Sequence, residues 1–78
     1  MRIRLYGKLA DAIGRELELD APDACSIGDV RRRLKSDYPD AAPALAAARA
    51  VVADTMVEDG RPTASNDTIE FLPLVSGG

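Results

Sequence analysis

The sequence contains no histidine and no tryptophan, and it has a single cysteine, Cys25, among 78 residues. The absence of histidine excludes His-based acid–base catalysis and Ser-His-Asp triads, and it removes the commonest metal ligand. One cysteine excludes an internal disulfide and any Cys-x-x-Cys redox or metal motif. The phosphate-cradling patterns GxGxxG and GxxxxGKS/T do not occur either. We therefore predict no metal site and no cofactor bound by this chain, and we expect a partner to supply the catalysis in any reaction that it joins.

Long apolar runs and an excess of positive charge are also missing. No stretch approaches the roughly 20 apolar residues that span a bilayer, and the opening Met-Arg-Ile-Arg-Leu-Tyr is not typical of a signal peptide. Ten basic against thirteen acidic side chains give a net charge of −3, whereas proteins that bind nucleic acid cluster their cations. We therefore expect a cytoplasmic protein that binds neither membranes nor nucleic acid.

Two segments near the N-terminus alternate apolar and polar residues with the period of a half-buried strand. They are residues 1–6 and 15–20, and the glycine-bracketed residues 7–14 between them are interpreted as a connection. An antiparallel hairpin would place basic and acidic side chains opposite each other on one face, where each pair contributes about 0.2–1 kcal/mol. The expected cross-strand partners are Arg2 and Arg4 with Glu16 and Glu18.

The clearest helix signal begins at Ser26. Ser26 and Asp29 have the spacing of a capping box, in which each side chain bonds the other residue's backbone N–H. An apolar stripe follows at helical spacing, and Pro39 predicts the end of the helix after Tyr38. The stripe consists of Ile27, Val30 and Leu34.

The rest of the chain predicts shorter elements, and their order defines the fold class. Residues 40–48 favour a short helical turn, 51–53 and 55–57 two short strands, and 68–72 a last strand with Ile69 and Phe71 inward. This order is typical of an α+β, β-grasp fold: a mixed sheet with one main helix on one face and the last strand parallel beside the first. We therefore predict a β-grasp domain over residues 1–72 and a flexible C-terminal tail over residues 73–78.

The tail combines apolar residues with a Gly-Gly end. Glycines without side chains fit a narrow channel in a partner's active site, and the apolar residues before them suit a hydrophobic groove. An α-carboxylate has a pKa of about 3.3–3.7 and is unreactive when ionised, so a partner must first convert it to an acyl-adenylate. The tail is therefore interpreted as a carried substrate. The predicted interface residues are Phe71, Leu72, Pro73, Leu74 and Val75, the threading residues are Ser76 and Gly77, and Gly78 is the reactive end.

Together the element order, the opening Ile3 to Ala10 and the ending Glu70 to Gly78 resemble a known family. The chain is similar to the small subunit of molybdopterin synthase (MoaD-like), a family of ubiquitin-like sulfur carriers related to ThiS. The resemblance covers essentially the whole chain and is most specific in the tail. Members commonly end in Phe-Phe-Pro-Pro-Val-x-Gly-Gly; here Leu72 stands at the second aromatic and Leu74 at the second proline, and both keep the apolar character.

The resemblance implies a small sulfur-donor subunit whose catalytic residues lie on the large subunit of molybdopterin synthase. It implies that a ubiquitin-activating-like adenylyltransferase uses ATP to adenylate the C-terminus, and that a sulfur donor protein supplies the sulfur of a thiocarboxylate on Gly78. The tail then enters the large subunit, where sulfur passes to cyclic pyranopterin monophosphate in molybdenum cofactor biosynthesis. Two carriers serve each pterin, so the family implies a heterotetramer.

Three other hypotheses stay open. The same carrier chemistry serves thiamin, cysteine or thioamide biosynthesis; alternatively, the chain is a ubiquitin-like modifier conjugated to lysines, or an interaction module whose Gly-Gly end has no role. Two further features receive plain interpretations. Cys25 is interpreted as a small packing residue, and the run Arg31, Arg32, Arg33 and Lys35 as a solvated helix face.

Overall fold

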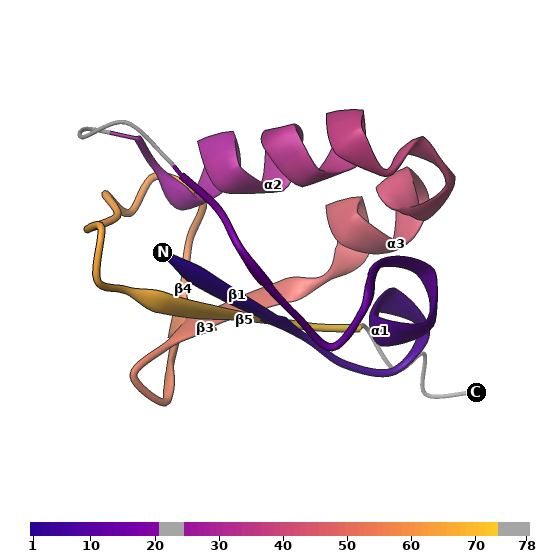
Figure 1. Cartoon of the computed structure of the whole chain (residues 1–78). Helices are drawn as coiled ribbons and strands as arrows, with labels where there is room; N and C mark the ends of the chain where they lie inside the picture. Colours follow the sequence, from indigo (N-terminus) through magenta and orange to yellow (C-terminus); the bar gives the residue numbers. More distant parts are fainter. Residues whose placement is uncertain (21–24, 74–78) are drawn as a thin grey trace.

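A computed structural model describes residues 1–20 and 25–73, which form a five-stranded mixed sheet with helices on one face (Figure 1). The elements are β1 (Arg2–Leu5), α1 (Lys8–Ile13), β2 (Glu16–Glu18), α2 (Ile27–Asp37), the 3₁₀ helix η1 (Pro39–Ala41), α3 (Ala42–Ala47), β3 (Arg49–Val52), β4 (Thr55–Val57) and β5 (Thr68–Leu72). The strands lie in the order β2-β1-β5-β3-β4. This is the predicted β-grasp arrangement, with α2 as its main helix.

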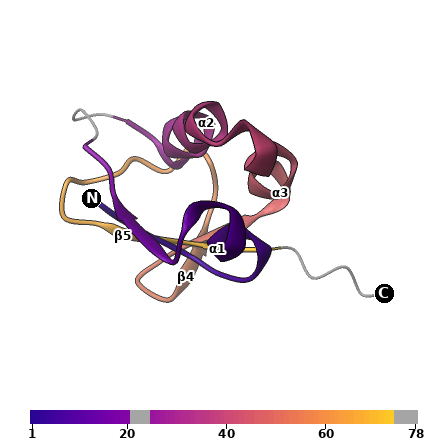
Figure 2. The same cartoon turned by 45° about the vertical axis from the view of Figure 1, so that its right-hand side comes forward.

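Strand β5 lies in the middle of the sheet although it is the last in the chain. It pairs parallel with β1, where Leu5 lies beside Phe71, and antiparallel with β3. The predicted return of the last strand to the first is therefore confirmed. Backbone hydrogen bonds hold β5 on both sides. They therefore fix the position of its C-terminal end, which lies beside α1 (Figures 1 and 2).

Strands β1 and β2 pair antiparallel, as the charge pattern predicts. Arg2 lies opposite Glu18 and Arg4 opposite Glu16. The ion pairs differ from the expectation, because Arg2 takes both carboxylates: its Nε is 2.8 Å from Glu16 Oε1 and 3.2 Å from Glu18 Oε1. Arg4 forms none of the ion pairs of the described residues.

The segment between β1 and β2 is a helix, so its interpretation as a plain connection is wrong. Helix α1 begins after Gly7 and ends before Gly14, and both glycines have positive φ, 58° and 119°. Leu9 is fully buried and anchors this helix to the core. Six residues are too few to show a helical period in sequence, and burial of Leu9 decides the conformation.

Helix α2 begins at the predicted capping box. The Ser26 hydroxyl accepts from Asp29 N at 3.2 Å, and the Asp29 carboxylate accepts from Ser26 N at 2.9 Å. The hydrogen bond from the Ser26 backbone N–H, and after it the Ser26 hydroxyl, lowers the pKa of the Asp29 carboxyl below its ordinary 3.8. The Tyr38 N–H closes the helix on Leu34 O before Pro39, as predicted.

Ser26→Ala is expected to lower the free energy of unfolding by about 1 kcal/mol, because the Asp29 N–H loses its partner. The matched control is Ser36→Ala, an exposed position within the same helix, where the change is expected within about 0.5 kcal/mol. Because the pKa of Asp29 is lower in the folded state than in the unfolded state, the ionised carboxylate stabilises the fold above the unfolded pKa. This stabilisation is lost as the pH falls through the folded pKa. The difference in the free energy of unfolding between the wild type and Ser26→Ala, measured by urea denaturation, should therefore become smaller in acid. Equal losses of stability in Ser26→Ala and Ser36→Ala would contradict the predicted cap.

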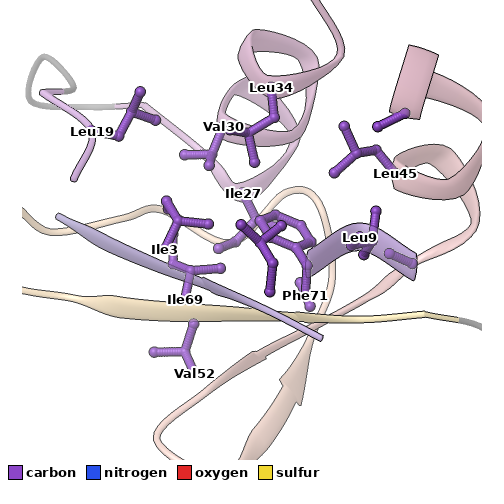
Figure 3. Close-up of a cluster of buried hydrophobic side chains, with 14 of the residues drawn as sticks. Ile3, Leu9, Leu19, Ile27, Val30, Leu34, Leu45, Val52, Ile69 and Phe71 are labelled. Carbon is purple, nitrogen blue, oxygen red and sulfur yellow. The ribbon is translucent and has the colours of Figure 1, made fainter. Parts of the chain in front are cut away.

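The core lies between the sheet and the helices (Figure 3). It confirms the inward side chains predicted for α2 and β5. Burial of each such side chain contributes about 1.5–3 kcal/mol. The largest fully buried side chains are Phe71, Ile3, Leu5, Leu9, Ile27, Leu34, Leu45, Ile69 and Val30.

Arg31 departs from the prediction of a solvated helix face. Its side chain is only 12% exposed, and its Nη1 donates to the carbonyl oxygens of Leu45 and Ala48, both at 2.6 Å. Its Nη2 lies 2.9 Å from Asp59 Oδ1, and its guanidinium carbon lies 5.4 Å from the centre of the Phe71 ring. The guanidinium therefore satisfies the end of α3 and ties α2 to the core.

The β3–β4 hairpin turns at Ala53 and Asp54, which have φ values of 51° and 64°. Two positive φ angles give a two-residue turn the twist that a hairpin needs, and glycine or asparagine usually occupies those positions. Ala53 therefore belongs to the turn, not to the predicted strand over residues 51–53. None of the helices within the described residues is long and apolar enough to cross a bilayer.

Candidate functional site

The candidate site is the point where the chain leaves the sheet after β5. Along this strand Ile69 and Phe71 face the core, whereas Thr68, Glu70 and Leu72 face away from it. Pro73 follows and is half-buried. The remaining predicted tail residues lie outside the described part of the chain; they are Leu74, Val75, Ser76, Gly77 and Gly78.

Phe71 and Leu72 divide the role that the sequence assigns to both. Phe71 is 0% exposed, with its ring in the core, so its predicted contact with a partner is corrected to a structural role. Leu72 is 37% exposed, one of the two large apolar side chains that stand out on the described surface. Of the predicted interface residues that the structure describes, Leu72 and Pro73 are the ones open to a partner.

The turn after β1 meets the end of β5. The Tyr6 hydroxyl donates to the Glu70 carboxylate across the two parallel strands. Gly7 lies beside Pro73, since a side chain at position 7 would place its Cβ 2.9 Å from Pro73 Cγ. We call these four residues, Tyr6, Gly7, Glu70 and Pro73, the tail-base corner.

The sequence reasoning did not include Tyr6 and Gly7 in the site. The available signal was the predicted parallel pairing of the first and last strands, which brings the residues that follow both strands to the same edge. A parallel pair predicted without its register does not show which residues meet. The observed register, with Leu5 beside Phe71, supplies that step.

The hydrogen bond to Glu70 raises the pKa of the Tyr6 phenol above its ordinary 10.0, and partial burial acts in the same direction. Because the pKa of Tyr6 is higher in the folded state than in the unfolded state, the protonated phenol stabilises the fold, and this contribution is fully present below the unfolded pKa. That stabilisation is lost as the pH rises through the folded pKa. The Tyr6 phenol therefore keeps the proton that it donates to Glu70 across the neutral range.

A shallow hollow of about 390 Å³ adjoins the corner. The residues that line it are Leu5, Tyr6, Gly7 and Ala10, the basic Arg4 and Arg15, and the acidic Glu16. Within the described residues, no group of three His, Cys, Asp or Glu side chains gathers to hold a metal ion. The surroundings of the tail base therefore offer apolar contact and side chains of both charges.

Cys25 is buried. Its Sγ is 3.0 Å from Thr63 Oγ1, and the Thr63 N–H and hydroxyl both bond the Cys25 carbonyl oxygen. This confirms Cys25 as a packing residue that joins the segment before α2 to the loop before β5.

The chain is similar to known proteins in its sequence and in its fold. The sequence matches the model of the ThiS family over residues 3–78, and no curated protein matches it significantly. SAMP1 from Haloferax volcanii has a TM-score of 0.83 at 22% identity, covering 99% of this chain and 97% of that chain. A putative molybdopterin converting factor subunit 1 from Pyrococcus furiosus has a TM-score of 0.83 at 14% identity, covering 95% of each chain.

A third solved structure contains two different chains. It is the complex of subunits 1 and 2 of molybdopterin-converting factor from Helicobacter pylori, with a TM-score of 0.70 at 20% identity, covering 99% of this chain and 96% of that chain. At these identities the likeness shows a shared fold, so the β-grasp assignment stands on the sheet order and on all three structures.

Proposed function

The chain belongs to the ThiS family, within the ThiS/MoaD-like group of ubiquitin-like sulfur carriers and modifiers, and from that membership we propose that it carries sulfur on Gly78 for molybdopterin synthesis. The observation that supports this most is the path of β5. The strand is held between β1 and β3 and leaves the fold at Pro73 beside an exposed Leu72. A partner can therefore take hold of the residues that follow without unfolding the domain.

The chemistry at Gly78 begins with activation. A carboxylate oxygen attacks the α-phosphate of ATP on an adenylyltransferase, pyrophosphate leaves, and an acyl-adenylate forms. Hydrosulfide supplied by a sulfur donor protein then attacks the carbonyl carbon, AMP leaves, and the S–H proton is lost. Activation is required because the ionised carboxylate has a pKa of about 3.3–3.7 and resists nucleophilic attack. The product is a thiocarboxylate on the carrier.

The chain's own residues bind and position the reacting end. Leu72 and Pro73, with Leu74 and Val75 after them, supply apolar contact to a groove in the large subunit of molybdopterin synthase. Ser76 and Gly77 are small enough to pass a narrow channel, which leaves Gly78 at the partner's active site. The large subunit then supplies the groups that move sulfur to cyclic pyranopterin monophosphate, in an assembly of two carriers and two large subunits. The complex of subunits 1 and 2 from Helicobacter pylori is consistent with such a partner.

Reconstitution tests the assignment to molybdopterin. The thiocarboxylated carrier is mixed with the large subunit of the same organism and cyclic pyranopterin monophosphate, and molybdopterin is measured. We expect about two carriers to be consumed for each molybdopterin formed. Thiocarboxylate that persists unchanged beside an active large subunit would reject the molybdopterin pathway and leave thiamin, cysteine or thioamide biosynthesis as the destination.

The likeness to SAMP1, and to the structure of H. volcanii small archaeal modifier protein 1, favours protein modification as the second candidate. An activated Gly78 would then form an amide with lysine side chains of other proteins. Denaturing blots of cells that express a tagged chain separate the two functions. A ladder of heavier adducts that needs Gly77 and Gly78 supports modification, and a single free band supports the carrier.

A further inference from the structure

We infer that the tail-base corner is a positioning device that sets the direction in which the tail leaves the sheet. Its elements are the ring of Pro73 against Gly7 and the hydrogen bond from Tyr6 to Glu70. The inference rests on the proposed function and adds to it the residues that prepare the tail for activation. Tyr6 and Gly7 are positioning residues, since they act through Pro73 and Glu70 and not on the reacting atoms.

The parallel pair β1–β5 creates the corner. Leu5 lies beside Phe71 in the register of these strands. The two strands separate immediately afterwards. The segment after β1 turns into α1 at Gly7, and the segment after β5 continues from Leu72 to Pro73. Gly7 therefore lies against Pro73, the residue where the tail begins.

Two features of the structure require glycine at position 7: the backbone conformation and the closeness of Pro73. Its φ of 58° lies in the left-handed region that glycine adopts without strain. The space that a side chain would fill is taken by the Pro73 ring, 2.9 Å from the ideal Cβ position. Gly14, at the other end of α1, has a φ of 119° but nothing within 4 Å of its ideal Cβ. The backbone explains glycine at both positions, and only the contact with Pro73 distinguishes Gly7.

Proline adds a fixed angle to this contact. Its ring holds φ near −65°, so a Pro73 that is seated against Gly7 has few directions in which to send the chain. The Tyr6–Glu70 hydrogen bond ties the residue before Gly7 to β5, two residues before Leu72. A tail that starts in a fixed direction loses less conformational entropy when a partner's channel receives it. The corner therefore raises the rate of tail activation without touching Gly78.

A double-mutant cycle on the full chain tests this. The variants are Gly7→Ala, Pro73→Ala and both together, with Gly14→Ala as the control for backbone strain. The readout is kcat/KM for ATP-dependent thiocarboxylate formation by the activating enzyme of the same organism. We expect Gly7→Ala to lower kcat/KM roughly tenfold when Pro73 is present, because displaced reacting groups cost rate steeply. In the Pro73→Ala background we expect a further change within about twofold, since the contact is already gone.

The outcomes separate the corner from the proposed function. Loss of rate by the same factor in both backgrounds, or in Gly14→Ala as much as in Gly7→Ala, would show that strain alone acts and would overturn the inference. Should Gly7→Ala fail to fold, Tyr6→Phe decides, because it removes the hydrogen bond to Glu70 and leaves the apolar segment of the tail unchanged. The kcat/KM of the folded variant should fall at least about threefold, and an unchanged rate would overturn the inference. A wild-type chain that is never converted contradicts the proposed function instead.

Discussion

Phe71→Ala is expected to lower the free energy of unfolding by about 3–5 kcal/mol, the usual loss when a buried aromatic side chain is removed from a core. The ring is 0% exposed, lies on the central strand and contacts the Arg31 guanidinium. The total stability of a chain of this length is about 4–12 kcal/mol. The variant should therefore lose a large share of its stability, measured by urea denaturation followed by circular dichroism.

The neighbouring residue supplies the control. Leu72 is 37% exposed on the opposite face of the same strand, so Leu72→Ala should cost less than about 1 kcal/mol. Leu72→Glu should keep the fold and weaken binding to the large subunit, measured by calorimetry. A small loss of stability for Phe71→Ala, or a large one for Leu72→Ala, would contradict the division between core and interface along β5.

Deleting Gly77 and Gly78 is expected to abolish molybdopterin formation while leaving the fold intact. The two residues bring no side chain to a core, so the free energy of unfolding should change by less than about 0.5 kcal/mol. Activity should fall to the background of the assay, because the deletion removes the carbonyl that accepts sulfur in the proposed chemistry. The measurement is the reconstituted synthase reaction, with urea denaturation of the same samples.

Single substitutions in the tail refine this result. Gly78→Ala keeps the carboxylate and adds one methyl group, which a narrow channel should reject, so we expect a roughly tenfold lower rate. Ser76→Ala makes its residue smaller and keeps the tail length; we expect a change within about twofold. Activity that survives the deletion of both glycines would instead support an interaction module whose Gly-Gly end has no role.

Local signals in the sequence predicted most of the fold. Alternation found β1, β2 and β5, and the spacing of Ser26 and Asp29 placed the start of α2 at the residue where the structure begins it. These features succeed because each is decided by neighbours in the chain. The element order then limited the topology to one that returns the last strand beside the first.

The parts that sequence reasoning missed are decided by tertiary packing. Helix α1 forms because Leu9 reaches the core, and Arg31 is buried because the end of α3 offers two carbonyl oxygens. A hydropathy pattern predicts every arginine to be a surface residue, because it carries no information on carbonyl oxygens that a guanidinium meets only in the folded chain. Phe71 shows the same limit, since an aromatic residue at the base of an apolar tail suits either a core or an interface.

The candidate site divides in a similar way. The sequence identified the tail by its composition, and no residue before β5 carried a comparable signal. The roles of Tyr6 and Gly7 depend on the register of two strands that are far apart in the chain. A glycine after a strand is common, and the meaning of Gly7 appears only when Pro73 is seen beside it.

The intact mass of the full chain, after incubation with ATP, a sulfur source and the activating enzyme of the same organism, tests the carrier function most directly. We expect a mass gain equal to the replacement of one oxygen by one sulfur, located at Gly78 by fragmentation and absent when Gly77 and Gly78 are deleted. An unchanged mass beside an enzyme shown to activate another carrier would contradict the proposed sulfur chemistry.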